Sequence, residues 1–71
     1  MYDLESAIKI TVKTVCDMQD GHIDRDLVSY YASGAINAMA ALDDRPIDII
    51  AYWVQQDVIE ERQRRKARPC N

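Results

Sequence analysis

The sequence has little turn-forming material and few of the residues that build common catalytic or metal sites. It contains two glycines, two prolines and one histidine in 71 residues. So few turn residues indicate a small number of long elements. There is no CxxC pair to suggest a zinc site, and no glycine-rich phosphate loop, GxSxG or HExxH motif. We therefore expect a protein that is not an enzyme and holds no metal or cofactor.

Cysteines and long apolar runs are equally scarce. No apolar run approaches the roughly 20 residues that span a bilayer, and no signal-peptide pattern opens the chain. These absences predict a cytoplasmic protein with reduced thiols and no membrane contact. Cys16 lies at the edge of an apolar stripe and is expected to be a small buried side chain, whereas Cys70 is expected to be an exposed thiol.

The size of the chain limits the core that it can build. A domain of 71 residues buries only about 60% of its unfolded surface and is marginal alone. Apolar residues nevertheless make up 48% of the sequence, which is too many for a disordered chain. Without disulfides or a metal, another protein chain is the expected support. The simplest such partner is a second copy, which predicts a homodimer. The alternative is a monomeric three-helix bundle.

Periodicity predicts an all-α fold, a three-helix bundle in a single domain over residues 1–66. The expected helices cover residues 3–20, 24–43 and 46–64, followed by a loose tail over residues 67–71. Asp3 and Asp24 have the character of N-caps, and Gly21 is expected to end the first helix in the left-handed conformation. Pro46 suits the first position of the third helix. Short connections make consecutive helices antiparallel.

The second predicted helix is apolar on most of its circumference. Such a helix is usually central, with neighbours on both flanks. Gly34, Ala38 and Ala41 are small and lie close together on the helical cylinder, so another backbone could approach closely there.

The third predicted helix carries more apolar surface than two neighbouring helices can cover. A core stripe runs through Ile50, Val54 and Val58, but other large apolar residues fall to either side of it. They either pack at the edge of the monomer core or meet a second chain, and tryptophan and tyrosine favour the second interpretation. The predicted apolar anchors of a partner-binding surface are Ile49, Tyr52, Trp53 and Ile59.

Charge is divided sharply along the chain. Residues 1–61 carry twelve acids and four bases, a net charge of −8, whereas residues 62–71 carry five bases and no acid, a net charge of +5. The bases could complement the helix dipole and form Glu60–Arg64 and Glu61–Arg65 pairs. They could instead form the charged rim of a partner-binding surface. The predicted rim residues are Arg62, Arg64, Arg65 and Lys66.

Nucleic acid is a possible but disfavoured partner of this basic end. The acidic body would oppose the approach of a polyanion, and nucleic-acid binders normally have a basic face on the folded part. The acidic residues could alternatively imitate DNA, but they cluster at the two ends of the second helix and do not form a regular ladder. The segment around His22 is best explained as a solvated turn, because its spacing does not match a calcium-binding loop.

These observations predict a small non-enzymatic interaction module, an adaptor, inhibitor or regulator that docks onto another protein through its third helix. From size alone, we expect that it could be encoded by a phage or mobile element. The alternative is a nucleic-acid-binding regulator that uses the basic end of a dimeric helical scaffold.

Overall fold

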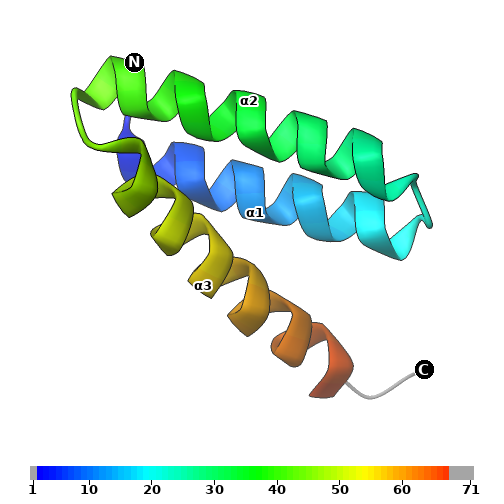
Figure 1. Ribbon diagram of the computed structural model, residues 1–71. Helices are drawn as coiled ribbons and strands as arrows, with labels where there is room; N and C mark the ends of the chain where they lie inside the picture. The colour runs from blue at the N-terminus through cyan, green and yellow to red at the C-terminus, as the bar shows by residue number, and fades with distance from the viewer. Residues whose placement is uncertain (1, 68–71) are drawn as a thin grey trace.

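Three helices account for nearly all of the chain. The computed structural model describes residues 2–67 and contains α1 (Leu4–Asp20), α2 (Arg25–Asp43) and α3 (Ile47–Ala67), as Figure 1 shows. The all-α prediction is therefore confirmed. The expected boundaries agree to within one residue, except that α3 extends to Ala67. The rest of the predicted tail, residues 68–71, lies outside the described residues, as does the expectation for Cys70.

Aspartates begin the first two helices. The Asp3 carboxylate accepts a hydrogen bond from the backbone N–H of Ser6 at 3.0 Å, and that of Asp24 accepts from Asp26 N–H at 2.8 Å. Each satisfies an amide that has no partner within its helix. At α3 the Pro46 carbonyl accepts the first helical bonds, so Pro46 lies just before the helix.

The prediction for Gly21 is wrong in detail. Gly21 keeps a negative φ of −83°, and the next residue, His22, adopts the left-handed conformation with φ 60°. The N–H groups of His22 and Ile23 bond back to the carbonyls of Gln19 and Met18, both at 3.0 Å. This is a Schellman ending, and histidine tolerates the left-handed region better than most side chains. Asp44 takes the same role after α2, with φ 53°.

The helices form an up-down-up arrangement in which α1 and α3 run in the same general direction (Figure 1). Because α2 runs in the opposite direction, the C-terminal ends of α1 and α3 lie at the same end of the molecule. The core lies where the three helices meet. Its buried members are Ile8, Val12, Cys16, Met39, Ile50 and Val54.

The central helix is α1, which corrects the expectation for α2. Five buried residues belong to α1, but only Val28 and Met39 of α2 are buried. The apolar circumference of α2 therefore faces solvent over much of its length. Which helix is central depends on the rotation of each helix about its axis, and the composition of α2 does not determine that rotation.

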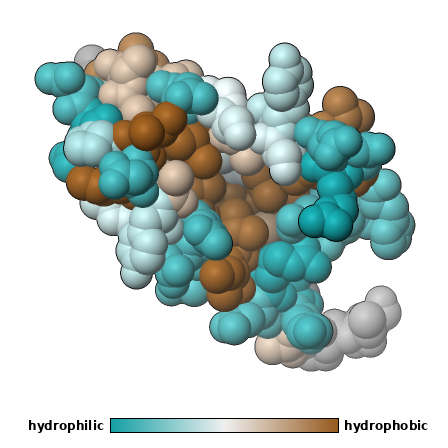
Figure 2. Space-filling view, viewed as in Figure 1, coloured by the Kyte–Doolittle hydropathy of each residue, from teal (hydrophilic) through white to brown (hydrophobic). Residues whose placement is uncertain are grey.

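The core contains few of the apolar residues in the chain. Eight apolar residues are buried, whereas eleven large hydrophobic residues are exposed. In Figure 2, brown side chains reach the surface over α3 and between α3 and the α1–α2 pair. The three helices thus leave apolar surface that a partner could cover. None of the helices in residues 2–67 has the length and apolar character needed to cross a membrane.

Candidate functional site

The four predicted anchors form the exposed side of α3, here called the α3 outer face. Ile50 and Val54 turn into the core, and the anchors lie on the remaining circumference. Their exposed fractions range from 36% for Trp53 to 59% for Tyr52. The exposure agrees with the sequence pattern, while their use in binding stays a prediction. The members of the α3 outer face are Ile49, Tyr52, Trp53 and Ile59.

The anchors span an arc of the helix surface. At about 100° per residue, Tyr52 and Ile59 lie at one edge of the arc, Trp53 lies at the other and Ile49 lies between them. Three further exposed side chains lie within the arc: Gln56 and Gln63 between Tyr52 and Ile49, and Glu60 between Ile49 and Trp53. A partner that covers the arc can desolvate the two amides at little cost, but it must provide a polar or basic group for the Glu60 carboxylate.

Trp53 is the least exposed of the anchors. It borders a hollow of about 400 Å³ between α3 and the start of α1, where Leu4 and Ile8 provide apolar walls. The guanidinium of Arg45 lies 5.5 Å from the centre of the indole ring, within the range of a cation–π contact. Arg45 is itself paired with Asp43. The indole is thus supported by Arg45 and also borders a recess that could accept an apolar side chain.

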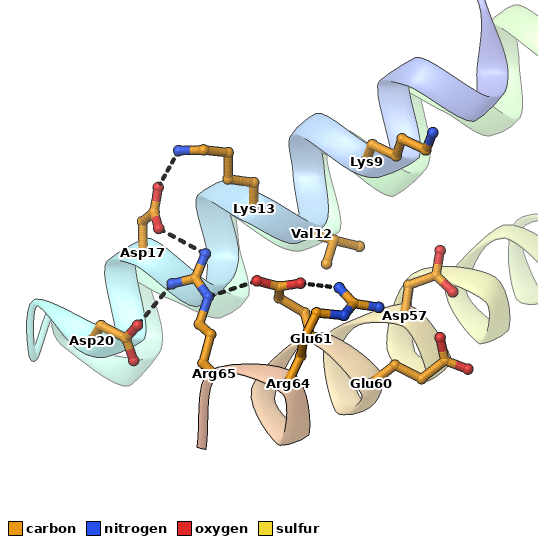
Figure 3. Close-up of a pocket in the computed structure, with 10 residues that line it drawn as sticks. All are labelled: Lys9, Val12, Lys13, Asp17, Asp20, Asp57, Glu60, Glu61, Arg64 and Arg65. Carbon is orange, nitrogen blue, oxygen red and sulfur yellow. Dashed lines mark hydrogen bonds and ion pairs between the residues drawn. The ribbon is translucent and has the colours of Figure 1, made fainter. Parts of the chain in front are cut away.

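The basic end of α3 is bound to its own chain, as Figure 3 shows. Arg65 Nη1 donates to Asp20 at 2.7 Å, Nη2 lies 2.9 Å from Asp17, and Nε donates to Glu61 at 2.8 Å. Asp17 also accepts from Lys13 at 2.8 Å. We call Arg65 and its three carboxylates, Asp17, Asp20 and Glu61, the Arg65 cluster.

The neighbouring bases divide between internal contacts and solvent. Arg62 Nη1 donates to the Gln19 side chain at 2.8 Å, and Arg64 pairs with Glu61. The predicted Glu61–Arg65 pair is present. The predicted Glu60–Arg64 pair is not formed, because Arg64 pairs with Glu61. Lys66 is exposed. The predicted charged rim is therefore largely occupied by contacts within the molecule.

The pKa values follow these contacts. Hydrogen bonds from Lys13 and Arg65 lower the pKa of Asp17, and the bond from Arg65 lowers that of Glu61. The hydrogen bonds to Glu61, Asp20 and Asp17 raise the pKa of Arg65 above its ordinary value. These shifts keep Asp17, Glu61 and Arg65 charged at neutral pH.

The Arg65 cluster borders a broad polar hollow of about 770 Å³ between α1 and α3. Its walls carry four basic and five acidic side chains (Figure 3), so it offers neither a clear anion site nor a clear cation site. Among residues 2–67, no three histidine, cysteine, aspartate or glutamate side chains lie together as metal ligands would. Cys16 is buried and unpaired, and burial raises the pKa of its thiol.

Sequence reasoning missed the cluster, although a signal was present. Asp17 and Asp20 lie near the C-terminus of α1, where carboxylates oppose the helix dipole. In an up-down-up fold the bases at the end of α3 lie at the same end of the molecule. Arg65 pairs there with both aspartates and offsets their unfavourable interaction with the dipole of α1. Comparison with protein-family models, curated proteins and solved structures finds no match to this chain.

Proposed function

We propose that this protein is a small non-enzymatic interaction module that docks onto another protein through the α3 outer face. The module would act as an adaptor, inhibitor or regulator by occupying a surface of its partner. The observation that carries the proposal is the exposure of Trp53 and Tyr52 beside aliphatic residues on one helix. Tryptophan and tyrosine are the residue types that most often dominate the binding energy of protein interfaces.

The geometry around Trp53 supports an anchor role. The guanidinium of Arg45 lies over the indole, so the ring is partly positioned before a partner binds. A preorganised aromatic beside an apolar recess is typical of interface hot spots. The acidic side chains Glu5 and Asp57 border the recess with Lys9 and make its rim polar.

The Arg65 cluster argues against nucleic acid as the partner. Arg65 is surrounded by three carboxylates, and Arg62 and Arg64 also bind groups of the same chain. A phosphate would have to compete with these carboxylates and approach the acidic body. The guanidinium groups therefore serve better to hold the end of α3 to α1 than to bind a polyanion.

We further propose that the protein acts as a homodimer. The chain exposes more large apolar residues than it buries apolar residues in its core, and a second copy would reduce this exposure. A dimer would also present two α3 outer faces and gain avidity for a partner with repeated sites.

The docking proposal is tested by affinity capture from the native cell with matched variants. Wild-type protein is compared with Tyr52→Ser and Trp53→Ala, and Ile10→Ala serves as the control. Ile10 is 64% exposed on α1, so its truncation removes a similar apolar side chain from a different face. We expect a specific partner that is retained by wild type and the control and is weakened at least tenfold by the Trp53 variant.

Salt separates the two classes of partner. Binding through phosphates should collapse between about 50 and 200 mM salt, whereas apolar docking should persist. A partner bound equally by wild type and both α3 variants would contradict the proposed site. A salt-sensitive nucleic acid that depends on Lys66 would contradict the proposed class.

A further inference from the structure

The outward side of α2 is a second uncovered apolar face, separate from the α3 outer face. Leu27 and Tyr30 are 57% and 82% exposed, and Gly34, Ala38 and Ala41 are exposed along the same side. These five residues define the α2 outer face. Residues 27–42 contain no charged side chain at all, although the chain as a whole is 30% charged. A solvent-facing helix normally carries charges on its outer side, so this face has the composition of a covered one.

We infer that the α2 outer face is covered by the same face of a second copy, with the two α2 helices packed antiparallel about a two-fold axis at Gly34. This inference rests on the self-association proposed above and is independent of the docking role of α3. It assigns the dimer interface to a helix that is chemically distinct from the docking helix.

The spacing of the face is symmetric about Gly34. Its members lie at intervals of three, four, four and three residues from Leu27 to Ala41. An antiparallel two-fold pairing centred on Gly34 therefore aligns every member with a member of the other copy. If a residue of one copy contacts a given residue of the other, the reverse contact is also made, as a two-fold interface requires.

The sizes of the aligned residues are complementary. Tyr30 of one copy faces Ala38 of the other, and Leu27 faces Ala41, so each large side chain meets a small one. At the axis Gly34 meets Gly34, where the two backbones come closest. A Cβ added at Gly34 has no neighbour within 4 Å in the single chain, so the packing of the monomer does not require glycine there. Glycine at an exposed position inside a helix is otherwise unfavourable.

Charge favours a second copy as the occupant. The body of the protein is acidic, so two copies repel over most of their surfaces. The uncharged stretch of α2 is 16 residues long, or about 24 Å, and is the place where two acidic chains can approach with the least repulsion. The acids of α2 lie at its two ends together with Arg25 and Arg45, so each end of the pair contains both signs of charge.

An interface of ordinary size would extend beyond the α2 outer face. A standard interface buries about 800 Å² on each partner. The α2 outer face would form the centre of such an interface, with its flanks contributed by neighbouring exposed residues such as Leu42.

The first test measures the mass of the purified protein by sedimentation equilibrium from about 1 to 300 μM. We expect a dimer of about 16.4 kDa, twice the mass of the 8.2 kDa chain. Gly34→Leu should raise the dissociation constant at least about 30-fold, because the new side chains occupy the axis. Circular dichroism should show an intact fold, since the site is open in the single chain. Ser29→Leu is the matched control, because Ser29 is exposed on α2 outside the α2 outer face.

A second test determines the register by disulfide crosslinking in a Cys70→Ser background, where the remaining native thiol, Cys16, is buried. Gly34→Cys should crosslink with itself on oxidation. Leu27→Cys should not crosslink with itself but should crosslink with Ala41→Cys in a mixture. Self-crosslinking of Leu27→Cys would indicate parallel helices and overturn the register.

Two mass results would overturn the assignment itself. A wild-type protein that stays at 8.2 kDa at the highest concentration excludes a second copy as the occupant. A dimer that survives Gly34→Leu but dissociates with Tyr52→Ser places self-association on α3. The first result leaves the capture experiment with Trp53→Ala unaffected, so the two proposals can fail separately. The second result would place both contacts on α3 and contradict the separation of the two faces.

Discussion

The outer faces of α2 and α3 are both apolar and exposed, but they are built differently. The α2 outer face is symmetric along the helix, rich in small residues and free of charge. The α3 outer face is asymmetric, with Trp53 fixed at one edge and ion-paired arginines at the end of the helix. A symmetric face suits an identical partner, whereas large anchors with a polar border suit a different protein. Exposure alone would not have separated the two.

The largest effect on the free energy of unfolding is expected from a substitution in the core on which both α2 and α3 pack. Ile50 is completely buried where α3 meets the core. Ile50→Ala should lower the free energy of unfolding by about 2–5 kcal/mol, because it leaves a cavity in a core with few members. Denaturant unfolding measures this loss. Ile10→Ala should change stability by no more than about 0.5 kcal/mol, and equal effects of the two would contradict the described core.

A substitution at Gly34 is expected to change the free energy of unfolding by a smaller amount and in the stabilising direction. In the isolated chain Gly34→Ala should raise the free energy of unfolding by about 0.5–1 kcal/mol, since alanine is the better helix former and the site is open. The same substitution should weaken the dimer. Unfolding at a concentration where the protein is monomeric, combined with sedimentation at high concentration, measures both. A variant that gains stability without losing dimerisation would remove the argument for close approach at this residue.

The Arg65 cluster should stabilise the end of α3 only while its carboxylates are charged. The pKa values of Asp17 and Glu61 lie below their ordinary values of 3.8 and 4.5, so their contribution is fully present above those values. It is lost as the pH falls through the lowered folded-state values. Arg65→Met should therefore speed amide exchange in residues 59–67 severalfold near neutral pH, relative to wild type.

Acid and salt provide the controls for this prediction. The difference between Arg65→Met and wild type should shrink below about pH 4 and in about 1 M salt, because the pairs are exposed and screened. Lys66→Met is the matched change beside the cluster and should have less effect. A difference that persists at low pH would indicate that Arg65 acts through packing and not through charge.

The smallest expected effect is the dependence of the dimer on salt. Antiparallel pairing of α2 brings acidic helix ends together, so moderate salt should strengthen the dimer slightly by screening the net repulsion. Sedimentation at about 20 and 200 mM salt measures the change. A dimer that weakens severalfold with salt would point instead to an interface held by the arginines of α3.

The helices could be predicted from sequence because local signals agree along most of the chain. Asp3 and Asp24 cap their helices, and the apolar period of residues 4–18 faces the core. Two features depended on the tertiary arrangement and could not be predicted. The central position of α1 follows from helix rotation, and the Arg65 cluster follows from the side of α3 that faces Asp17 and Asp20. The exposure of Trp53 could be predicted, since two helices cannot surround a third one completely.

The central claim is that the chain uses separate faces for itself and for its partner. Trp53 is the only tryptophan, so its fluorescence reports on the α3 outer face alone. Acrylamide quenching of Trp53 is measured across the dilution series in which the dimer dissociates. The account predicts the same quenching for dimer and monomer, because α2 forms the dimer interface. Shielding of Trp53 in the dimer, lost on dilution, would contradict it.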